Sequence, residues 1–122
     1  MTARRRLLAP LLAPVFLLAA AAACGDPTLE PLPLDVLIQP SRTTAAPGET
    51  INFVVDVQGG NLVGVDVDYG DTAVERYSTG GARRGHIVFR HAYSAAGTYT
   101  VRATVTDASA GTKEATVDVQ VQ

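Results

Sequence analysis

The sequence contains a single cysteine, Cys24, so that residue has no partner for an internal disulfide. Stability must therefore come from a packed hydrophobic core. After residue 35 the sequence also lacks apolar residues spaced three and four apart, the spacing that indicates an amphipathic helix. It has no Gly-x-Ser-x-Gly nucleophile motif and no glycine-rich phosphate loop leading into a helix. We expect a domain without disulfides or helices, and not an enzyme.

Residues 1–23 have the layout of a secretory signal. Three arginines, Arg4 to Arg6, precede a seventeen-residue apolar run from Leu7 to Ala23. An uncleaved membrane anchor is the alternative, but the run is short for a membrane span and contains Pro10 and Pro14. We predict a signal peptide over residues 1–23, and therefore export.

Cys24 follows small residues at the end of this segment. The stretch "AAAACGD" resembles the lipobox of bacterial lipoproteins, although Ala21 stands where leucine is more usual. The resemblance implies that Cys24 is lipidated and ties the chain to the bacterial cell membrane or the outer membrane. Gly25 after the cysteine favours the outer membrane in a diderm organism. The alternative is an unmodified thiol beside an ordinary cleavage site.

The segment 24–34 contains three prolines and is predicted to be an extended spacer in front of a domain over residues 35–122. Residues 24–122 carry seven basic and all twelve acidic side chains, a balance of −5. Bulk charge therefore gives the domain no affinity for nucleic acid or for an anionic membrane surface.

Beyond residue 35 apolar and polar residues alternate, which is typical of strands with one buried and one exposed face. One such stretch is predicted to bury four residues on the same face, namely Val63, Val65, Val67 and Tyr69. Turn sequences rich in glycine separate the alternating stretches. Seven strands are expected, near residues 35–40, 50–58, 62–69, 73–78, 86–92, 98–107 and 113–121. This spacing predicts an immunoglobulin-like antiparallel β-sandwich.

Two motifs then resemble one family. The stretch "VDVDYGD" (Val65–Asp71) resembles the Asp-Phe-Gly-Asp signature of the polycystic-kidney-disease (PKD) domain, and "HAYSAAGTYTVRATVTD" (His91–Asp107) is similar to its His-x-Tyr…Gly-x-Tyr segment. The similarity spans residues 35–121. Val67 replaces the usual tryptophan, and Thr72 replaces the glycine after Asp71.

The motif residues are expected to act structurally. We expect the Asp71 carboxylate to accept backbone N–H groups in its turn, and Tyr99 to form a tyrosine corner with Gly97 before it. The alternation places the His91 side chain on the inward face of its strand and the His86 side chain on the outward face, so a structural role is favoured over metal binding. The motif set is Asp68, Tyr69, Gly70, Asp71, His91, Tyr93, Gly97 and Tyr99.

Two surface sites are candidates for binding. Asp56, Asp66 and Asp68 share outward parity and could hold Ca²⁺, although a solvated acidic face explains them as well. No other cofactor is expected. The loop over residues 78–86 places Arg83 and Arg84 among glycines, near the one tyrosine with outward parity, Tyr77.

The family resemblance implies a non-catalytic, extracytoplasmic module that binds a protein or a glycan in the envelope. A structural spacer or envelope-assembly subunit without a ligand is one alternative. A carbohydrate-binding module is another, but it requires exposed aromatic rings, and Tyr77 is the one clear candidate.

Overall fold

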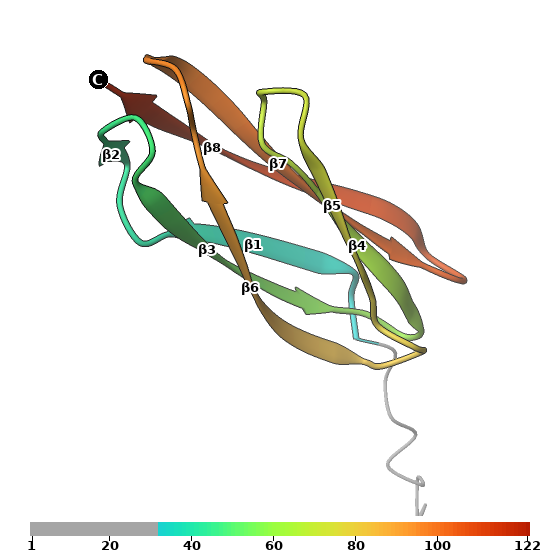
Figure 1. Cartoon of the computed structure of the whole chain (residues 1–122). Helices are drawn as coiled ribbons and strands as arrows, with labels where there is room; N and C mark the ends of the chain where they lie inside the picture. The colour runs from blue at the N-terminus through green and yellow to red at the C-terminus, as the bar shows by residue number, and fades with distance from the viewer. Residues whose placement is uncertain (1–31) are drawn as a thin grey trace, which may run out of the picture.

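The computed structural model describes residues 32–122, and every regular element in that part of the chain is a β-strand. The strands form two sheets packed face to face (Figure 1), one with the order β1–β3–β6 and the other with the order β2–β8–β7–β4–β5. The strands are β1 (Asp35–Pro40), β2 (Thr44–Ala45), β3 (Thr50–Gln58), β4 (Leu62–Asp68), β5 (Val74–Ser78), β6 (Arg84–Ala92), β7 (Gly97–Asp107) and β8 (Gly111–Val121). The predicted immunoglobulin-like β-sandwich is confirmed.

The core fills the space between the two sheets with alternate residues of each long strand. On β3, for example, four residues from Ile51 to Val57 are at most 5% exposed, and the residues between them face outward. On β7, Val101, Ala103 and Val105 are fully buried in the same cluster. Burial of each such aliphatic side chain contributes about 1.5–3 kcal/mol, so the alternation itself holds the sandwich together.

The seven predicted strands all occur, and their ends differ from the predicted ranges by at most two residues. Strand β2 was not predicted; it pairs with β8 in parallel orientation, so the chain passes from the three-stranded to the five-stranded sheet after β1. The prediction for Val63 is wrong, because its side chain is 50% exposed. The pairing of β4 with β7 shifts register between Leu62 and Gly64, and Leu62 takes the buried position instead.

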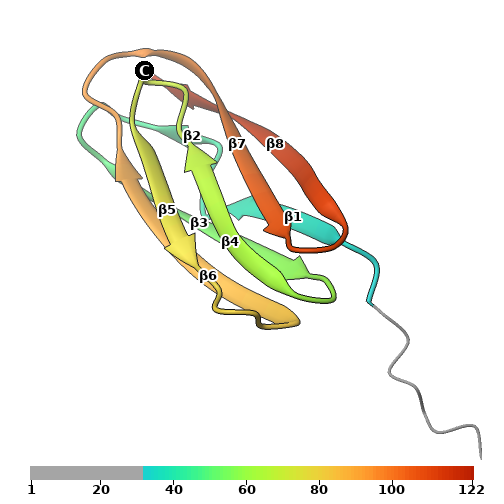
Figure 2. The same ribbon diagram turned by 90° about the vertical axis from the view of Figure 1, so that its right-hand side faces the viewer.

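The sandwich has two ends that differ in what they contain (Figure 2). We call one end the N-terminal pole: β1 begins there, and the turns 59–61, 79–83 and 108–110 lie there. We call the other end the C-terminal pole: it holds the loops 69–73 and 93–96 and the last residues of β8. The two recognised motifs meet at the C-terminal pole.

Candidate functional site

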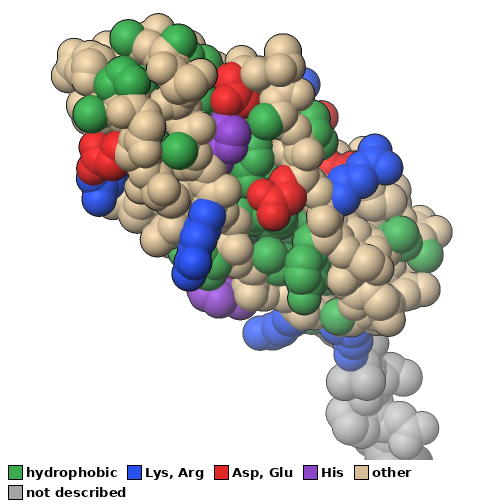
Figure 3. All heavy atoms as spheres, viewed as in Figure 1, with side chains coloured by type: hydrophobic (Ala, Val, Ile, Leu, Met, Phe, Trp, Pro, Cys, Tyr) green, Lys and Arg blue, Asp and Glu red, His purple; other side chains and the backbone are tan. Residues whose placement is uncertain are grey.

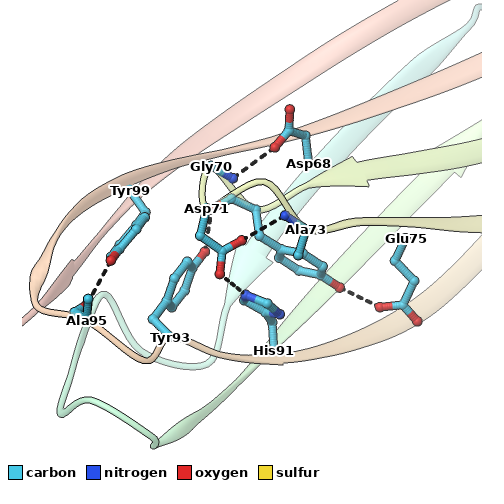
Figure 4. Close-up of polar contacts among 10 residues, drawn as sticks. Asp68, Gly70, Asp71, Ala73, Glu75, His91, Tyr93, Ala95 and Tyr99 are labelled. Carbon is cyan, nitrogen blue, oxygen red and sulfur yellow. Dashed lines mark hydrogen bonds and ion pairs between the residues drawn. The ribbon is translucent and has the colours of Figure 1, made fainter.

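The two motifs contact each other through a histidine and a carboxylate. His91, near the end of β6, places its Nε2 atom 2.6 Å from Oδ2 of Asp71 in the loop between β4 and β5 (Figure 4). An ionised carboxylate only accepts hydrogen bonds, so Nε2 carries the proton and donates. The two side chains are 17% and 22% exposed, so this pair is largely shielded from solvent.

Aromatic rings surround the histidine. The His91 ring stacks on Tyr69 with the ring centroids 4.0 Å apart and an interplanar angle of 8°. Its other neighbour, Tyr93, meets it edge-on at 4.7 Å and 87°. Tyr93 in turn stacks on Tyr99 at 4.2 Å. These rings form one continuous row across the C-terminal pole, so the orientation of His91 is fixed on two sides.

Each tyrosine hydroxyl in the row donates a hydrogen bond within the protein. Tyr69 donates to Oε2 of Glu75 on β5 at 2.7 Å, and Tyr93 donates to the backbone carbonyl of Tyr69 at 2.8 Å. Burial, followed by the contact with Glu75, raises the pKa of Tyr69 well above its ordinary value. Burial, followed by the charge of Asp71, raises the pKa of Tyr93 in the same way. Both phenols therefore stay protonated and act as structural donors.

Tyr99 makes the contact of a tyrosine corner. Its hydroxyl donates to the carbonyl oxygen of Ala95, four residues upstream, at 2.7 Å, and its ring is half-buried. Gly97, which precedes it at the start of β7, has a φ of +156°. The loop from β6 to β7 is therefore tied to the strand that follows it.

The loop that carries Asp71 is held by short-range hydrogen bonds. Asp68 accepts from the Gly70 N–H at 2.9 Å through Oδ1, and Asp71 accepts from the Ala73 N–H at 3.2 Å through its own Oδ1. Two residues of this loop have positive φ, Gly70 at 82° and Thr72 at 77°. A Cβ on Gly70 would lie 2.8 Å from a backbone oxygen of β7, which explains glycine there. Both carboxylate oxygens of Asp71 are engaged, one in its own turn and one with the histidine.

This cluster connects β4, β5, β6 and β7 at one pole through hydrogen bonds between its own members. A histidine, a carboxylate and tyrosine hydroxyls are groups that could act in catalysis or ligand binding, but here they form hydrogen bonds within the protein. Such an arrangement fixes the geometry of two loops.

A second cluster of hydrogen-bonded polar groups lies at the N-terminal pole, and it was not predicted from the sequence. Asp107 is 2% exposed, and its carboxylate accepts from the backbone N–H groups of Asn61, Ser109 and Ala110 at 2.7–3.0 Å. These N–H donors hold the pKa of Asp107 well below its usual range. The available signal was an aspartate directly before an Ala-Ser-Ala-Gly turn, although its bond to Asn61 spans 46 residues.

The structure does not bring together the three carboxylates of the predicted calcium site. Asp56 lies on β3 in the three-stranded sheet, where it contacts Nδ1 of His86 at 2.6 Å. Asp66 and Asp68 lie on β4 in the other sheet, and Asp66 pairs with Nε of Arg76 at 3.2 Å. Within residues 32–122, no group of three or more His, Cys, Asp or Glu side chains is placed to hold a metal ion.

The residues of the predicted binding site lie in two separate parts of the fold. Tyr77 lies on the edge strand β5 and is 50% exposed. Arg83 ends the turn before β6, and Arg84 is the first residue of that strand. Arg84 lines a shallow depression of about 290 Å³ together with Asp35, Leu37, Asp56, Val57, Gln58 and Gly85.

Cys24 and the predicted signal and spacer up to residue 31 lie outside the described residues. In the described part, no helix has the length and hydrophobicity needed to span a membrane.

Comparisons with known proteins identify the sandwich. The sequence model of the PKD domain family matches residues 35–121. The PKD domain of the human VPS10 domain-containing receptor SorCS2 is 31% identical, with a TM-score of 0.53 over 75% of this chain and 74% of that one. The PKD domain of an M14-like peptidase from a Thermoplasmatales archaeon is 22% identical, with a TM-score of 0.63 over 70% and 91% of the two chains. The PKD1 domain of Vibrio anguillarum Epp is also 22% identical, with a TM-score of 0.56 over 73% and 93%. No curated protein matches the sequence.

Proposed function

Because this chain belongs to the PKD domain family, whose members are often interaction modules, we propose that it is an exported binding module presented from a lipid anchor at Cys24. The domain begins at residue 35, ten residues after Gly25, so the anchor and the sandwich are close in the chain. The signal-like first 23 residues and the cysteine that follows them support export and lipidation.

The observation that carries the binding function is the edge strand β5. It pairs with β4 alone, and all five of its residues are exposed. Its outer edge therefore offers backbone N–H and C=O groups that another strand can pair with. Of the five large hydrophobic side chains that are exposed within residues 32–122, three lie on β4 and β5, namely Val63, Val74 and Tyr77. We infer a protein partner that adds an extended segment along β5.

The test separates the anchor from the binding surface. Cells grown with a tagged fatty acid should label the wild-type protein and leave Cys24→Ala unlabelled; equal labelling of both would refute the anchor. Partners captured from native envelopes with the wild type should then be lost with the double variant Val74→Thr/Tyr77→Thr. The matched control is Leu37→Thr/Val88→Thr, which removes two equally exposed apolar side chains from the other sheet.

Retention of the same partners by both double variants would refute β5 as the binding surface. Binding to a glycan array that depends on Tyr77 alone would replace the protein partner with a glycan, since a single exposed ring can stack on a sugar.

A further inference from the structure

The two sheets end on the same side of the sandwich, each in a strand with a free edge. Strand β6 pairs with β3 alone, as β5 pairs with β4 alone, and the turn 79–83 joins the two strands. We call the side between the outer edges of β5 and β6 the open side. Figure 3 shows hydrophobic side chains gathered there, between the strands labelled β6 and β5 in Figure 1. This side therefore presents both free backbone edges and apolar surface.

Strand β5 extends past the cover of the three-stranded sheet. Tyr77 lies opposite Val65 and Glu75 opposite Val67, and residues directly opposite each other in an antiparallel pair point to the same face. Both valines are fully buried between the sheets, so Tyr77 and Glu75 also point to the inner side, although the alternation in the sequence placed Tyr77 outward. Both side chains are nevertheless exposed. A fourth strand added along β6 would lie beneath them.

Strand β6 provides the longest free edge in the described part of the chain. It has nine residues, whereas β5 has five, β2 has two, and β1 has six and ends at Pro40. Its register with β3 is continuous, without a bulge. Within residues 32–122, the backbone from Arg84 to Arg90 is hydrogen-bonded to β3 alone. Alternate N–H and C=O groups of this stretch therefore face the open side, where another strand can pair with them.

The side chains of β6 indicate which residues an added strand needs. Ile87 and Phe89 point inward and border the core, so the inner face of an added strand needs apolar residues. Arg90 points outward and belongs to no ion pair within the described residues, and the residue opposite it on β3 is the uncharged Asn52. The outer face therefore needs an acidic residue beside Arg90. Pairing with β6 of a second copy does not supply one, because β6 contains no acidic residue.

We propose that the free edge of β6 is a second binding site, which takes an extended segment of a partner protein with alternating apolar and acidic residues. The segment extends the sheet β1–β3–β6 to four strands. Its apolar residues pack against Ile87, Phe89 and Tyr77, and a carboxylate pairs with the Arg90 guanidinium. The site uses neither the proposed lipid anchor nor the outer edge of β5, so it goes beyond the proposed function and can be tested separately.

The experiment uses synthetic peptides and the full chain in detergent micelles. A fluorescent peptide of nine residues, the length of β6, alternates glutamate and valine. One matched peptide has lysine in place of glutamate, and another has a central proline, which removes a backbone donor. We expect fluorescence anisotropy to show the tightest binding for the glutamate peptide. In its complex, hydrogen exchange should slow at the amides of residues 84–90 on β6 and stay unchanged at residues 74–78 on β5.

Charge reversal tests the role of Arg90. Arg90→Glu replaces an attractive cross-strand pair with a repulsive one, so the affinity for the glutamate peptide should fall about tenfold. The lysine peptide should then become the better ligand, a gain that misfolding of the variant does not produce. The matched control is Arg76→Glu, which changes the charge equally at an exposed arginine of β5 and should leave both affinities unchanged.

Slower exchange confined to residues 74–78, or a peptide preference that reverses with Arg76→Glu and not with Arg90→Glu, would overturn the inference and leave the proposed β5 surface intact. Equal affinity of the wild type for the glutamate and lysine peptides would overturn it as well, because the partner would then not be selected by its acidic residues. Absence of binding by every peptide at millimolar concentration would rule out the β6 site, whatever the result of partner capture from envelopes.

Discussion

Thr72 offers a direct test of how the Asp71 loop is built. It is the one non-glycine residue with positive φ between residues 32 and 122, at 77°. A β-branched side chain is poorly suited to this left-handed region because its Cβ substituents crowd the backbone. The Thr72 side chain is exposed, so replacing it changes mainly the conformational energy of the loop.

The expected gain follows from two opposing contributions. A residue with a Cβ in the left-handed region costs about 1–2 kcal/mol relative to its usual conformation, and glycine avoids this cost. Glycine also makes the unfolded chain more flexible, which removes about 0.5–1 kcal/mol. Thr72→Gly should therefore raise the free energy of unfolding by about 0.5–1 kcal/mol, or the melting temperature by about 3–6 °C for a domain of this size.

Urea unfolding of a form of the chain that begins at Gly25 measures the effect. Thr72→Ala keeps a Cβ and should remain close to the wild type, whereas Thr72→Asn should gain stability because asparagine tolerates this region. Thr43→Gly is the matched control: Thr43 is an exposed loop threonine without positive φ, and it should lose about 0.5–1 kcal/mol. If Thr72→Gly loses as much stability as Thr43→Gly, the loop is not strained as the backbone angle indicates.

Three further changes test the two poles by urea unfolding. Gly70→Ala should destabilise the domain by about 2 kcal/mol or more, because φ is 82° and the new Cβ meets a backbone oxygen; an unchanged midpoint would contradict this. Tyr93→Phe should cost about 1–3 kcal/mol, because it leaves the buried Tyr69 carbonyl without its donor; a loss below 0.5 kcal/mol would show that the carbonyl is not dependent on it. The folded-state pKa of Asp107 is lowered, so its contribution to stability is complete above its ordinary value of 3.8 and is lost as the pH falls below that value. Asp107→Asn should be less stable than the wild type at pH 7, and its midpoint should fall less between pH 5 and pH 3; parallel pH profiles would contradict the assignment.

The strands were predictable because their burial depends on a pattern of period two that each strand carries by itself. Residues such as Phe53 and Val101 stand in long alternating stretches, and both are fully buried. Strand β2 has two residues, too few to show any period. The prediction that Val63 is buried was wrong for a related reason. The register shift beside Leu62 changes which residues of the strand face inward, and the alternation in the sequence does not indicate that shift.

Contacts between strands were harder to predict, because they depend on which strand lies in which sheet. Asp56 and Asp66 have the same outward parity on consecutive strands, yet the chain changes sheets between them and their faces point in different directions. The bond between His91 and Asp71 joins residues 20 positions apart. Parity indicates that His91 points inward, but it does not identify the carboxylate that it meets.

The same reasoning explains why the motifs identify the family and reveal little about the partner. In the cluster at the C-terminal pole, a buried polar group without a hydrogen-bond partner is costly, so His91, Asp71 and Tyr93 restrict one another and leave a recognisable pattern. On the β5 edge, water satisfies any polar group, so residues there are free to suit a partner and leave no pattern of their own. The aspartate and histidine that look most chemical therefore serve the fold. The binding role proposed for Tyr77 depends on its exposure on an edge strand, which is seen only once the strands are placed in their sheets.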